Sequence, residues 1–197
     1  MNIYDISQEV FSCVVFPGDP APKREVLSDI NSGEICNLTA FSMCAHNGTH
    51  VDAPYHFIND GKKIDEIELS NLIGYAYVTY HEGTINENEI RMILKKAKEH
   101  SKECVSKILV GGKATLSLDA ACVLAEQGID LFGNESQTVG PEEAPLEVHK
   151  TLLKANIVLL EGIRLANVKE GVYMLFAAPI CLGGADGAPC RAVLVEL

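Results

Sequence analysis

The sequence predicts a single α/β domain that covers residues 1–197. From about residue 64 onward, segments with helical periodicity alternate with short apolar runs, which is the pattern of an α/β protein. The chain has the length of one typical domain and contains neither an internal repeat nor a recognisable linker. Apolar residues make up 47% of it and charged residues 22%, so it is expected to form a packed core.

The first third of the chain is rich in strand-forming residues. Short β-prone runs cover 3–6 and 11–16, and the three prolines within 17–22 exclude regular strand pairing there. The runs 23–30 and 34–45 are separated by residues that favour a turn, so we expect a hairpin that leads into a histidine-rich segment.

Three helices and five strands are expected in the rest of the chain. Asn86 with Glu89 forms a capping-box pattern, Ser117 is a good N-cap, and Pro145 suits a first helical turn. The predicted helices cover 86–100, 117–127 and 145–155. The predicted strands cover 105–111, 128–132, 157–160, 173–181 and 191–197. A glycine-rich loop at 183–187 precedes the last strand, and its Asp186 is expected to cap a turn.

Charge and apolar patterning exclude several function classes. The formal net charge of −11 would repel nucleic acid and anionic lipid, so neither is an expected partner. The longest apolar run, 172–182, is too short for a membrane helix and contains a proline. The first basic residue is Lys23, so no signal peptide is recognisable and a cytoplasmic protein is expected. The 7 cysteines include no C-x-x-C pair, which indicates reduced, largely buried thiols.

Three of the 6 histidines lie in the segment His46–His56. Because alternate side chains of a strand face the same way, His50 and Asp52 are expected to point to one centre. Gly48 lets the backbone bend and bring His46 towards that centre. Two imidazoles and a carboxylate suit Zn²⁺ or Mn²⁺ and leave positions for water. Hydrogen-bonded histidines without a metal are the alternative interpretation.

His149 and Glu161 add donors for a second metal ion. His149 lies on the third predicted helix, and Glu161 directly follows an apolar strand, where α/β sheets often present ligands. A solvated histidine and an ion-paired glutamate are their alternative interpretations. Pro54 ends the strand before His56, so His56 is expected to lie beyond the direct ligands.

The histidine segment resembles the H-x-G-T-H-x-D-x-P-x-H signature of the cyclase family of metal-dependent hydrolases, which includes bacterial kynurenine formamidases. Every fixed position matches, at His46, Gly48, Thr49, His50, Asp52, Pro54 and His56. The resemblance covers nearly the whole chain, since 16–19, 128–130 and 183–193 look like the family's P-G-D, G-I-D and G-A-D-G-A-P-x-R-A-V segments. The chain departs from the pattern at Phe16, where the family's formamidases typically carry Trp, and at 110–113, where an R-T-G strand end is usual.

The resemblance implies a swivelling β/β/α fold, assembled as a homodimer or homotetramer, with two metal ions per chain. Zn²⁺ is the expected metal, and Mn²⁺ is possible. The first ion would be held by His46, His50, Asp52 and Glu161, and the second by Asp52, His149 and Glu161. His56 would be the acid/base, and Phe16 would contact the substrate.

This chemistry favours hydrolysis of a small-molecule amide. Metal-bound water with a pKa near ~7 supplies hydroxide at neutral pH. The imidazole of His56 can take up the proton and return it to the leaving amine. With the resemblance, this predicts cleavage of an aryl formamide, N-formyl-kynurenine to kynurenine plus formate, in tryptophan catabolism. The alternatives are hydrolysis of a cyclic amide or lactone, as in proteins similar to isatin hydrolase, and a non-catalytic metal-binding protein.

Overall fold

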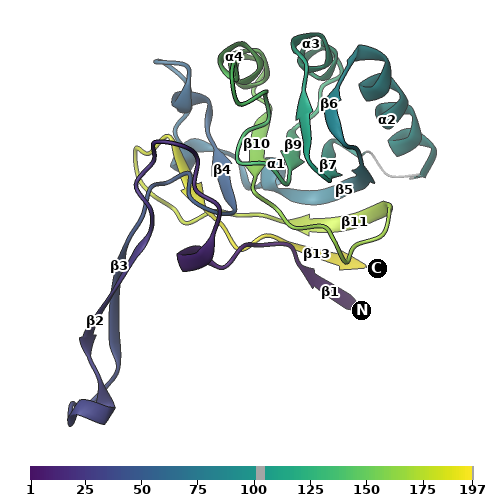
Figure 1. The fold of residues 1–197 in the computed structure, drawn as a ribbon. Coiled ribbons are helices and arrows are strands. Elements are labelled where there is room, and N and C mark those ends of the chain that lie inside the picture. Colours follow the sequence, from purple (N-terminus) through teal and green to yellow (C-terminus); the bar gives the residue numbers. More distant parts are fainter. Residues whose placement is uncertain (101–104, 197) are drawn as a thin grey trace.

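The computed structural model describes residues 1–100 and 105–196, which contain a nine-stranded mixed sheet (Figure 1). Its strands, in order across the sheet, are β1 (Asn2–Asp5), β13 (Val193–Glu196), β11 (Gly171–Phe176), β5 (Ile73–Tyr80), β7 (Lys107–Gly111), β9 (Leu131–Asn134), β10 (Val158–Glu161), β4 (His50–Asp52) and β12 (Gly187–Pro189). The central strands β5, β7, β9 and β10 are parallel, and the flanking strands pair antiparallel. The predicted α/β class is confirmed.

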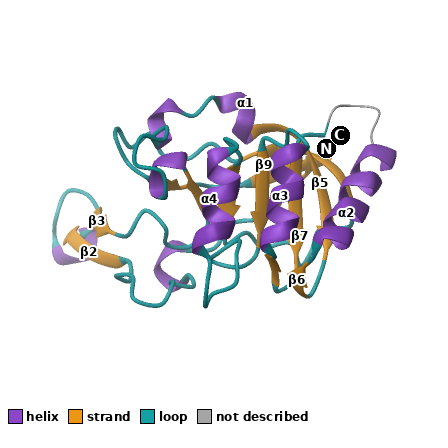
Figure 2. Cartoon of the chain, turned by 90° about the horizontal axis from the view of Figure 1, so that it is seen from above, coloured by secondary structure: helices purple, strands orange, loops and turns teal. Residues whose placement is uncertain are grey.

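Three helices lie side by side over one face of the sheet (Figures 1 and 2). They are α2 (Glu87–His100), α3 (Leu118–Glu126) and α4 (Leu146–Lys154). The predicted caps start the first two helices. The backbone N–H of Glu89 donates to Asn86 Oδ1 at 3.1 Å, and that of Ala120 donates to Ser117 Oγ at 3.2 Å. All three predicted helices are confirmed.

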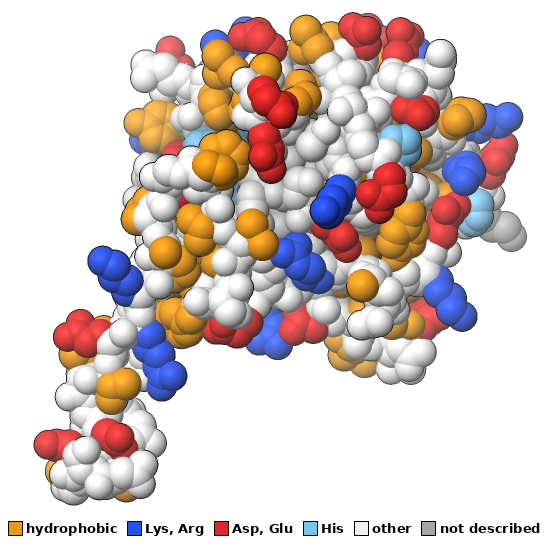
Figure 3. All heavy atoms as spheres, viewed as in Figure 1, with side chains coloured by type: hydrophobic (Ala, Val, Ile, Leu, Met, Phe, Trp, Pro, Cys, Tyr) orange, Lys and Arg blue, Asp and Glu red, His pale blue; other side chains and the backbone are white. Residues whose placement is uncertain are grey.

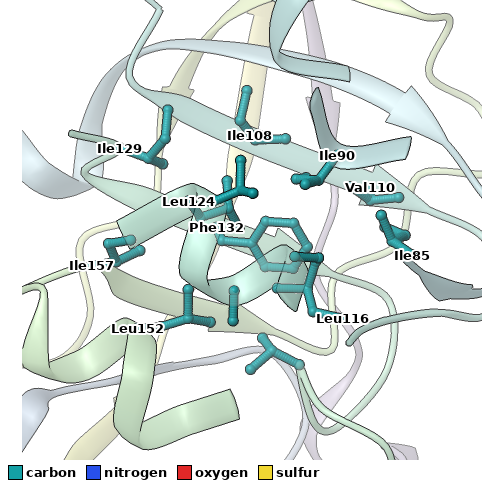
Figure 4. Packing of buried hydrophobic residues seen from close by; sticks show 14 of the residues in the cluster. Ile85, Ile90, Ile108, Val110, Leu116, Leu124, Ile129, Phe132, Leu152 and Ile157 are labelled. Atoms are coloured by element: carbon teal, nitrogen blue, oxygen red, sulfur yellow. The ribbon is translucent and has the colours of Figure 1, made fainter. Parts of the chain in front are cut away.

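The central strands are apolar on both faces because each face is covered. Ile108 and Val110 of β7 pack in one cluster with the helices, together with Phe132 of β9 (Figure 4). The intervening Leu109 packs in a second cluster on the opposite face, with residues of β11 and β13 such as Leu194. In Figure 1 the sheet curls so that these strands lie beneath its centre, which gives two β layers and one helical layer.

A two-stranded hairpin projects from this body (Figures 1 and 3). We call residues 23–42 the arm; it consists of β2 (Lys23–Ser28), β3 (Leu38–Ser42) and the connection between them, which includes the 3-10 turn Ile30–Ser32. The predicted hairpin is therefore confirmed. A further small parallel sheet pairs β6 (Gly83–Ile85) with β8 (Ala114–Leu116).

One predicted strand is wrong, and several others are shorter than expected or displaced: the run 34–45 contains only β3, and β9 begins at Leu131 rather than at residue 128. Residues 11–16 form no strand, because the Glu9 side chain accepts hydrogen bonds from the backbone N–H groups of Phe11 and Ser12 and caps a 3-10 turn, Val10–Ser12. The strand expected at 173–181 ends at Phe176, and Pro179 forms only an isolated bridge to Cys190. The remaining short helical segments are Pro54–His56, Ile64–Glu66 and α1 (Leu69–Leu72).

The cysteines are less buried than the sequence suggested. Cys36, Cys122 and Cys181 are exposed, and Cys13, Cys44 and Cys190 are half-buried. All six are free thiols. Within the described residues, no helix is long and apolar enough to span a membrane.

Candidate metal centre

Strand β4 brings two of the predicted ligands onto the helical face of the sheet. The side chain of Val51 enters the core cluster on the opposite face, so its neighbours His50 and Asp52 point to the helical side. Gly48, with a φ of +68°, turns the chain just before the strand, in the left-handed region that favours glycine. This turn lets His46 approach the same centre.

Two other elements supply the remaining predicted ligands. Glu161 ends β10 and pairs directly with His50 in the antiparallel β10–β4 ladder, so both side chains share one face. His149 lies on α4 and donates from Nδ1 to the carbonyl oxygen of Pro145 at 2.9 Å. His50 likewise donates from Nδ1 to the carbonyl oxygen of Gly48 at 3.0 Å. Each of these rings therefore directs Nε2 to the centre.

The donor atoms form two groups that share Asp52, and Glu161 of the second group also lies beside His50 of the first. In the first group, Asp52 Oδ1 lies 2.8 Å from His46 Nδ1 and 3.2 Å from His50 Nε2. Glu161 Oε2 is 3.4 Å from His50 Nε2. In the second group, His149 Nε2 lies 3.1 Å from Glu161 Oε1 and 3.9 Å from Asp52 Oδ2. The structure thus brings all five predicted ligands together.

Burial and mutual contact shift the pKa values of the three histidines. Burial alone would lower the pKa of His46, but hydrogen bonds to Asp186 and Asp52 outweigh it and raise the pKa to about 11. The pKa of His50 rises to about 10, since its hydrogen bonds to Asp52 and Glu161 outweigh burial. The pKa of His149 is also raised, because Glu161 outweighs the effect of burial.

The carboxylates shift in the opposite direction. Burial would raise the pKa of Asp52, but His46 and His50 hold it well below its usual range. Burial and the charge of Asp52 would raise the pKa of Glu161, but hydrogen bonds from His149 and His50 lower it. Both acids are therefore ionised at neutral pH and need cationic partners.

The chemistry of this donor set fits divalent metal ions. Asp52 and Glu161 are only 1% and 2% exposed, and buried carboxylates are costly unless protons or cations compensate them. Imidazole nitrogen and carboxylate oxygen are the donors that Zn²⁺ and Mn²⁺ accept. The donor atoms within each group converge closely enough to bind one ion.

A cavity of about 240 Å³ opens over this centre. Phe16, the predicted substrate contact, lines the cavity together with Phe57 and Gln137. His56 also lines it and belongs to neither of these two donor groups, but its donor atom converges with those of His46 and Asp186. Its ring centroid lies 4.0 Å from that of His46 and 6.4 Å from that of His149. His56 thus lies beside the predicted ligands, and its role as the acid/base stays a prediction.

Asp186 is the main site residue that the sequence interpretation missed. The expectation that it caps a turn is wrong, because its Oδ2 lies 2.9 Å from His46 Nε2 and 3.1 Å from His56 Nδ1. The hydrogen bond from His46 is the largest cause that lowers the pKa of Asp186. A Cβ on the next residue, Gly187, would stand 2.7 Å from His46 Cε1, so only glycine lets this loop reach the ring. The sequence signal that could have indicated this role is a charged residue in the glycine-rich loop 183–187.

The fold and the paired donor groups define an α/β protein with a candidate two-metal centre. The chain belongs to the cyclase family, whose model, described as "Putative cyclase", matches residues 4–141.

Several known proteins similar to this chain are described as formamidases or hydrolases. The kynurenine formamidase of Bacillus mycoides (strain KBAB4) is 36% identical over 206 residues, which cover 96% of this chain and 95% of that protein. A solved structure described as a potential metal-dependent hydrolase with cyclase activity is 27% identical, with a TM-score of 0.83 and coverage of 98% and 96%. Isatin hydrolase A from Labrenzia aggregata shares the fold, with 20% identity, a TM-score of 0.83 and coverage of 100% and 94%.

Proposed function

We propose that the protein is a metal-dependent hydrolase of aryl formamides, which converts N-formyl-kynurenine to kynurenine and formate. The observation that carries this proposal is the sharing of Asp52 between two donor groups that Glu161 also connects through His50, with His56 on the wall of the same cavity. The 36% identity to a kynurenine formamidase over nearly the whole chain supports the choice of substrate.

The chain's own residues provide the other requirements of the reaction. His46, His50, Asp52, His149 and Glu161 would hold the ions, which supply Lewis acidity for the scissile carbonyl and for water. His56 uses Nδ1 to bind Asp186, so its Nε2 can accept a proton from water and return it to the leaving nitrogen. An aniline needs this protonation because its anion is a poor leaving group.

The cavity walls suit an aryl substrate. Phe16 is half-buried and is fixed at the start of a turn, in which the backbone N–H of Asp19 donates to its carbonyl oxygen at 3.1 Å. Phe57 packs against His149, with ring centroids 4.8 Å apart. Two aromatic side chains beside the donor groups can contact a substrate ring and exclude water from it.

Zinc is the proposed metal, with two ions per chain and manganese as the alternative. Three imidazoles among five donors favour zinc over the harder cations that prefer oxygen. We also propose a cytoplasmic location, because six free thiols, three of them exposed, suit a reducing compartment.

A homodimer is the proposed assembly, with the arm as its contact. Six apolar side chains of the arm are each more than half exposed: Val26, Leu27, Ile30, Ile35, Leu38 and Phe41. An isolated two-stranded ribbon is marginally stable in water. A cavity of about 840 Å³ at the base of the arm is lined by apolar side chains that include Phe11, Met43 and Ile180. We propose that the arm of one copy packs into this cavity of its partner.

A substrate panel tests the proposed activity. Zinc-loaded protein would be assayed with an aryl formamide, an aliphatic formamide, an isatin-type cyclic amide and a lactone, with the His56→Ala variant as control. The aryl formamide should give the highest kcat/KM. Turnover of the cyclic amide or lactone without deformylation would favour the isatin-hydrolase-like alternative. Full metal loading without any turnover would favour a non-catalytic metal-binding protein.

A further inference from the structure

One carboxylate oxygen contacts both a candidate metal ligand and the candidate acid/base. Asp186 Oδ2 lies 2.9 Å from His46 Nε2 and 3.1 Å from His56 Nδ1. The two imidazole rings lie nearly face to face, with centroids 4.0 Å apart and an interplanar angle of 31°. A single oxygen of Asp186 therefore contacts one nitrogen of each ring.

The backbone around Asp186 is fixed independently of its side chain. The N–H of Ala53 donates to the carbonyl oxygen of Asp186 at 3.0 Å, and that of Ile64 donates to the carbonyl oxygen of Ala185 at 2.9 Å. The N–H of Gly184 donates to Asp65 Oδ1 at 2.9 Å. The loop thus stays in place if only the Asp186 side chain changes.

The contacts of Asp186 determine where the protons of both rings lie. An ionised carboxylate only accepts hydrogen bonds, so His46 donates from Nε2 and His56 donates from Nδ1. Without metal, His46 Nδ1 also donates, to Asp52 Oδ1 at 2.8 Å. When a metal ion displaces this proton, the lone pair of Nδ1 would face the centre. His56 keeps the lone pair of Nε2 for a substrate proton.

We propose that Asp186 is a positioning residue that couples the metal centre to His56 by fixing the tautomer and ring orientation of both histidines. The part of this inference that concerns His56 rests on the proposed function, and the part that concerns His46 and metal affinity does not. Carboxylates that hold metal-ligating histidines in this way typically raise metal affinity by ~10–100-fold.

A metal ion bound directly by Asp186, His46 and His56 is the competing interpretation, since their donor atoms also converge. In that arrangement His46 would bind metal through both ring nitrogens and would have to lose both of its protons. His56 Nδ1 would also bind the metal ion in place of its hydrogen bond to Asp186. The hydrogen-bonded arrangement requires neither change, so it is the one we adopt.

The test compares Asp186→Asn with Asp65→Asn, a matched change in the 3-10 turn Ile64–Glu66, where Oδ1 can still accept from Gly184 and the side chain touches neither histidine. Zinc affinity is measured by competition with a chelator, and kcat and KM with an aryl formamide. Asp186→Asn should weaken zinc binding by ~10–100-fold. It should also lower kcat by ~10²-fold or more with little change in KM, within the range of general acid/base catalysis. Asp65→Asn should change neither quantity.

A double-mutant cycle isolates the link to His56. If Asp186 acts through His56, then Asp186→Asn should lower the residual kcat of the His56→Ala variant far less than it lowers that of the wild type. Asp186→Glu, which keeps the carboxylate on a side chain that is partly exposed, should retain more metal affinity and kcat than Asp186→Asn.

Several results would overturn the proposal. Wild-type zinc affinity in Asp186→Asn would exclude the link to His46. If Asp186→Asn lowered kcat by the same factor in the His56→Ala variant as in the wild type, the link to His56 would be excluded. Loss of one whole ion per chain in Asp186→Asn would instead identify Asp186 as a ligand. Zinc-loaded wild type that cleaves no aryl formamide would contradict the proposed function, while the affinity comparison would still decide the link to His46.

Discussion

Glu161 and His50 face each other across the antiparallel pair of β10 and β4, with Glu161 Oε2 3.4 Å from His50 Nε2. A shift of one residue in this register would turn one of the two side chains to the opposite face of the sheet. The apolar partners Leu160 and Val51 fix the register, because both pack in the core cluster on that opposite face. The geometry of the candidate metal centre therefore depends on core packing as well as on the ligands.

Asp52→Asn should remove both metal ions from the protein. Asp52 offers Oδ1 to the first donor group and Oδ2 to the second, so replacement by an amide weakens both sites together. Elemental analysis of protein purified without chelator should find about two ions per wild-type chain and close to none in the variant. A wild-type value near one would favour a mononuclear centre, and a value near zero would contradict the site.

His56→Ala should leave metal content nearly unchanged and lower kcat by ~10²–10⁴-fold. His56 lines the cavity but lies outside the two donor groups that share Asp52. The measurement is elemental analysis beside steady-state kinetics on the same preparation. Loss of metal in this variant would make His56 a ligand and would require another proton carrier.

After removal of metal by a chelator, the free energy of unfolding should fall as the pH rises above about 6.5. The folded pKa values of His46, about 11, and His50, about 10, lie above the ordinary value of 6.5. Their contribution is therefore complete below pH 6.5 and is lost as pH rises towards 10–11, at up to ~1.4 kcal/mol per pH unit for each histidine. Asp52, whose pKa is lowered, contributes above its ordinary value of 3.8 and loses this contribution as the pH falls.

Urea unfolding in chelator between pH 5 and 9.5 checks this dependence. Metal must displace the protons of His46 and His50, so zinc binding at neutral pH should release protons and should be tighter at pH 8 than at pH 6. Titration calorimetry in two buffers of different ionisation enthalpy measures that release. A chelated protein whose stability rises steadily from pH 6.5 to 9 would contradict the assigned contacts.

The arm should be required for assembly. Light scattering after size exclusion should show a dimer for the wild type and a monomer for Ile35→Asp, because Ile35 is 99% exposed and a buried charge at a contact is costly. Met92→Asp is the matched control, since Met92 is a 60% exposed apolar side chain on α2, far from the arm along the chain. A monomeric wild type, or a dimer that Ile35→Asp leaves intact, would exclude this contact.

Local signals predicted most of the fold because they act over a few residues. The caps at Asn86 and Ser117 fixed helix starts, and His50 and Asp52 could be placed together by strand alternation alone. Asp186 could not be placed in this way. It reaches His46 because β12 pairs with β4, a contact between segments more than 130 residues apart whose partner no local pattern identifies. The segment 11–16 misled because the Glu9 side chain competes with strand pairing for its backbone N–H groups.

Phe16→Ala should raise KM for an aryl formamide more than for a small aliphatic formamide. Phe16 lines the cavity over the donor groups and is held between a turn and the proline-rich segment, so it offers a fixed apolar surface to a substrate ring. Loss of an aromatic contact of ~0.5–1.5 kcal/mol corresponds to a rise in KM of roughly 2–13-fold for the aryl substrate. Phe176→Ala is the matched control and should change neither KM, because Phe176 is a 41% exposed phenylalanine on β11 that does not line this cavity.

An equal rise in KM for both formamides would show that Phe16 shapes the centre rather than contacting the substrate ring. An unchanged KM for both would remove Phe16 from the binding site, and the preference for aryl groups would then depend on Phe57, which lines the same cavity.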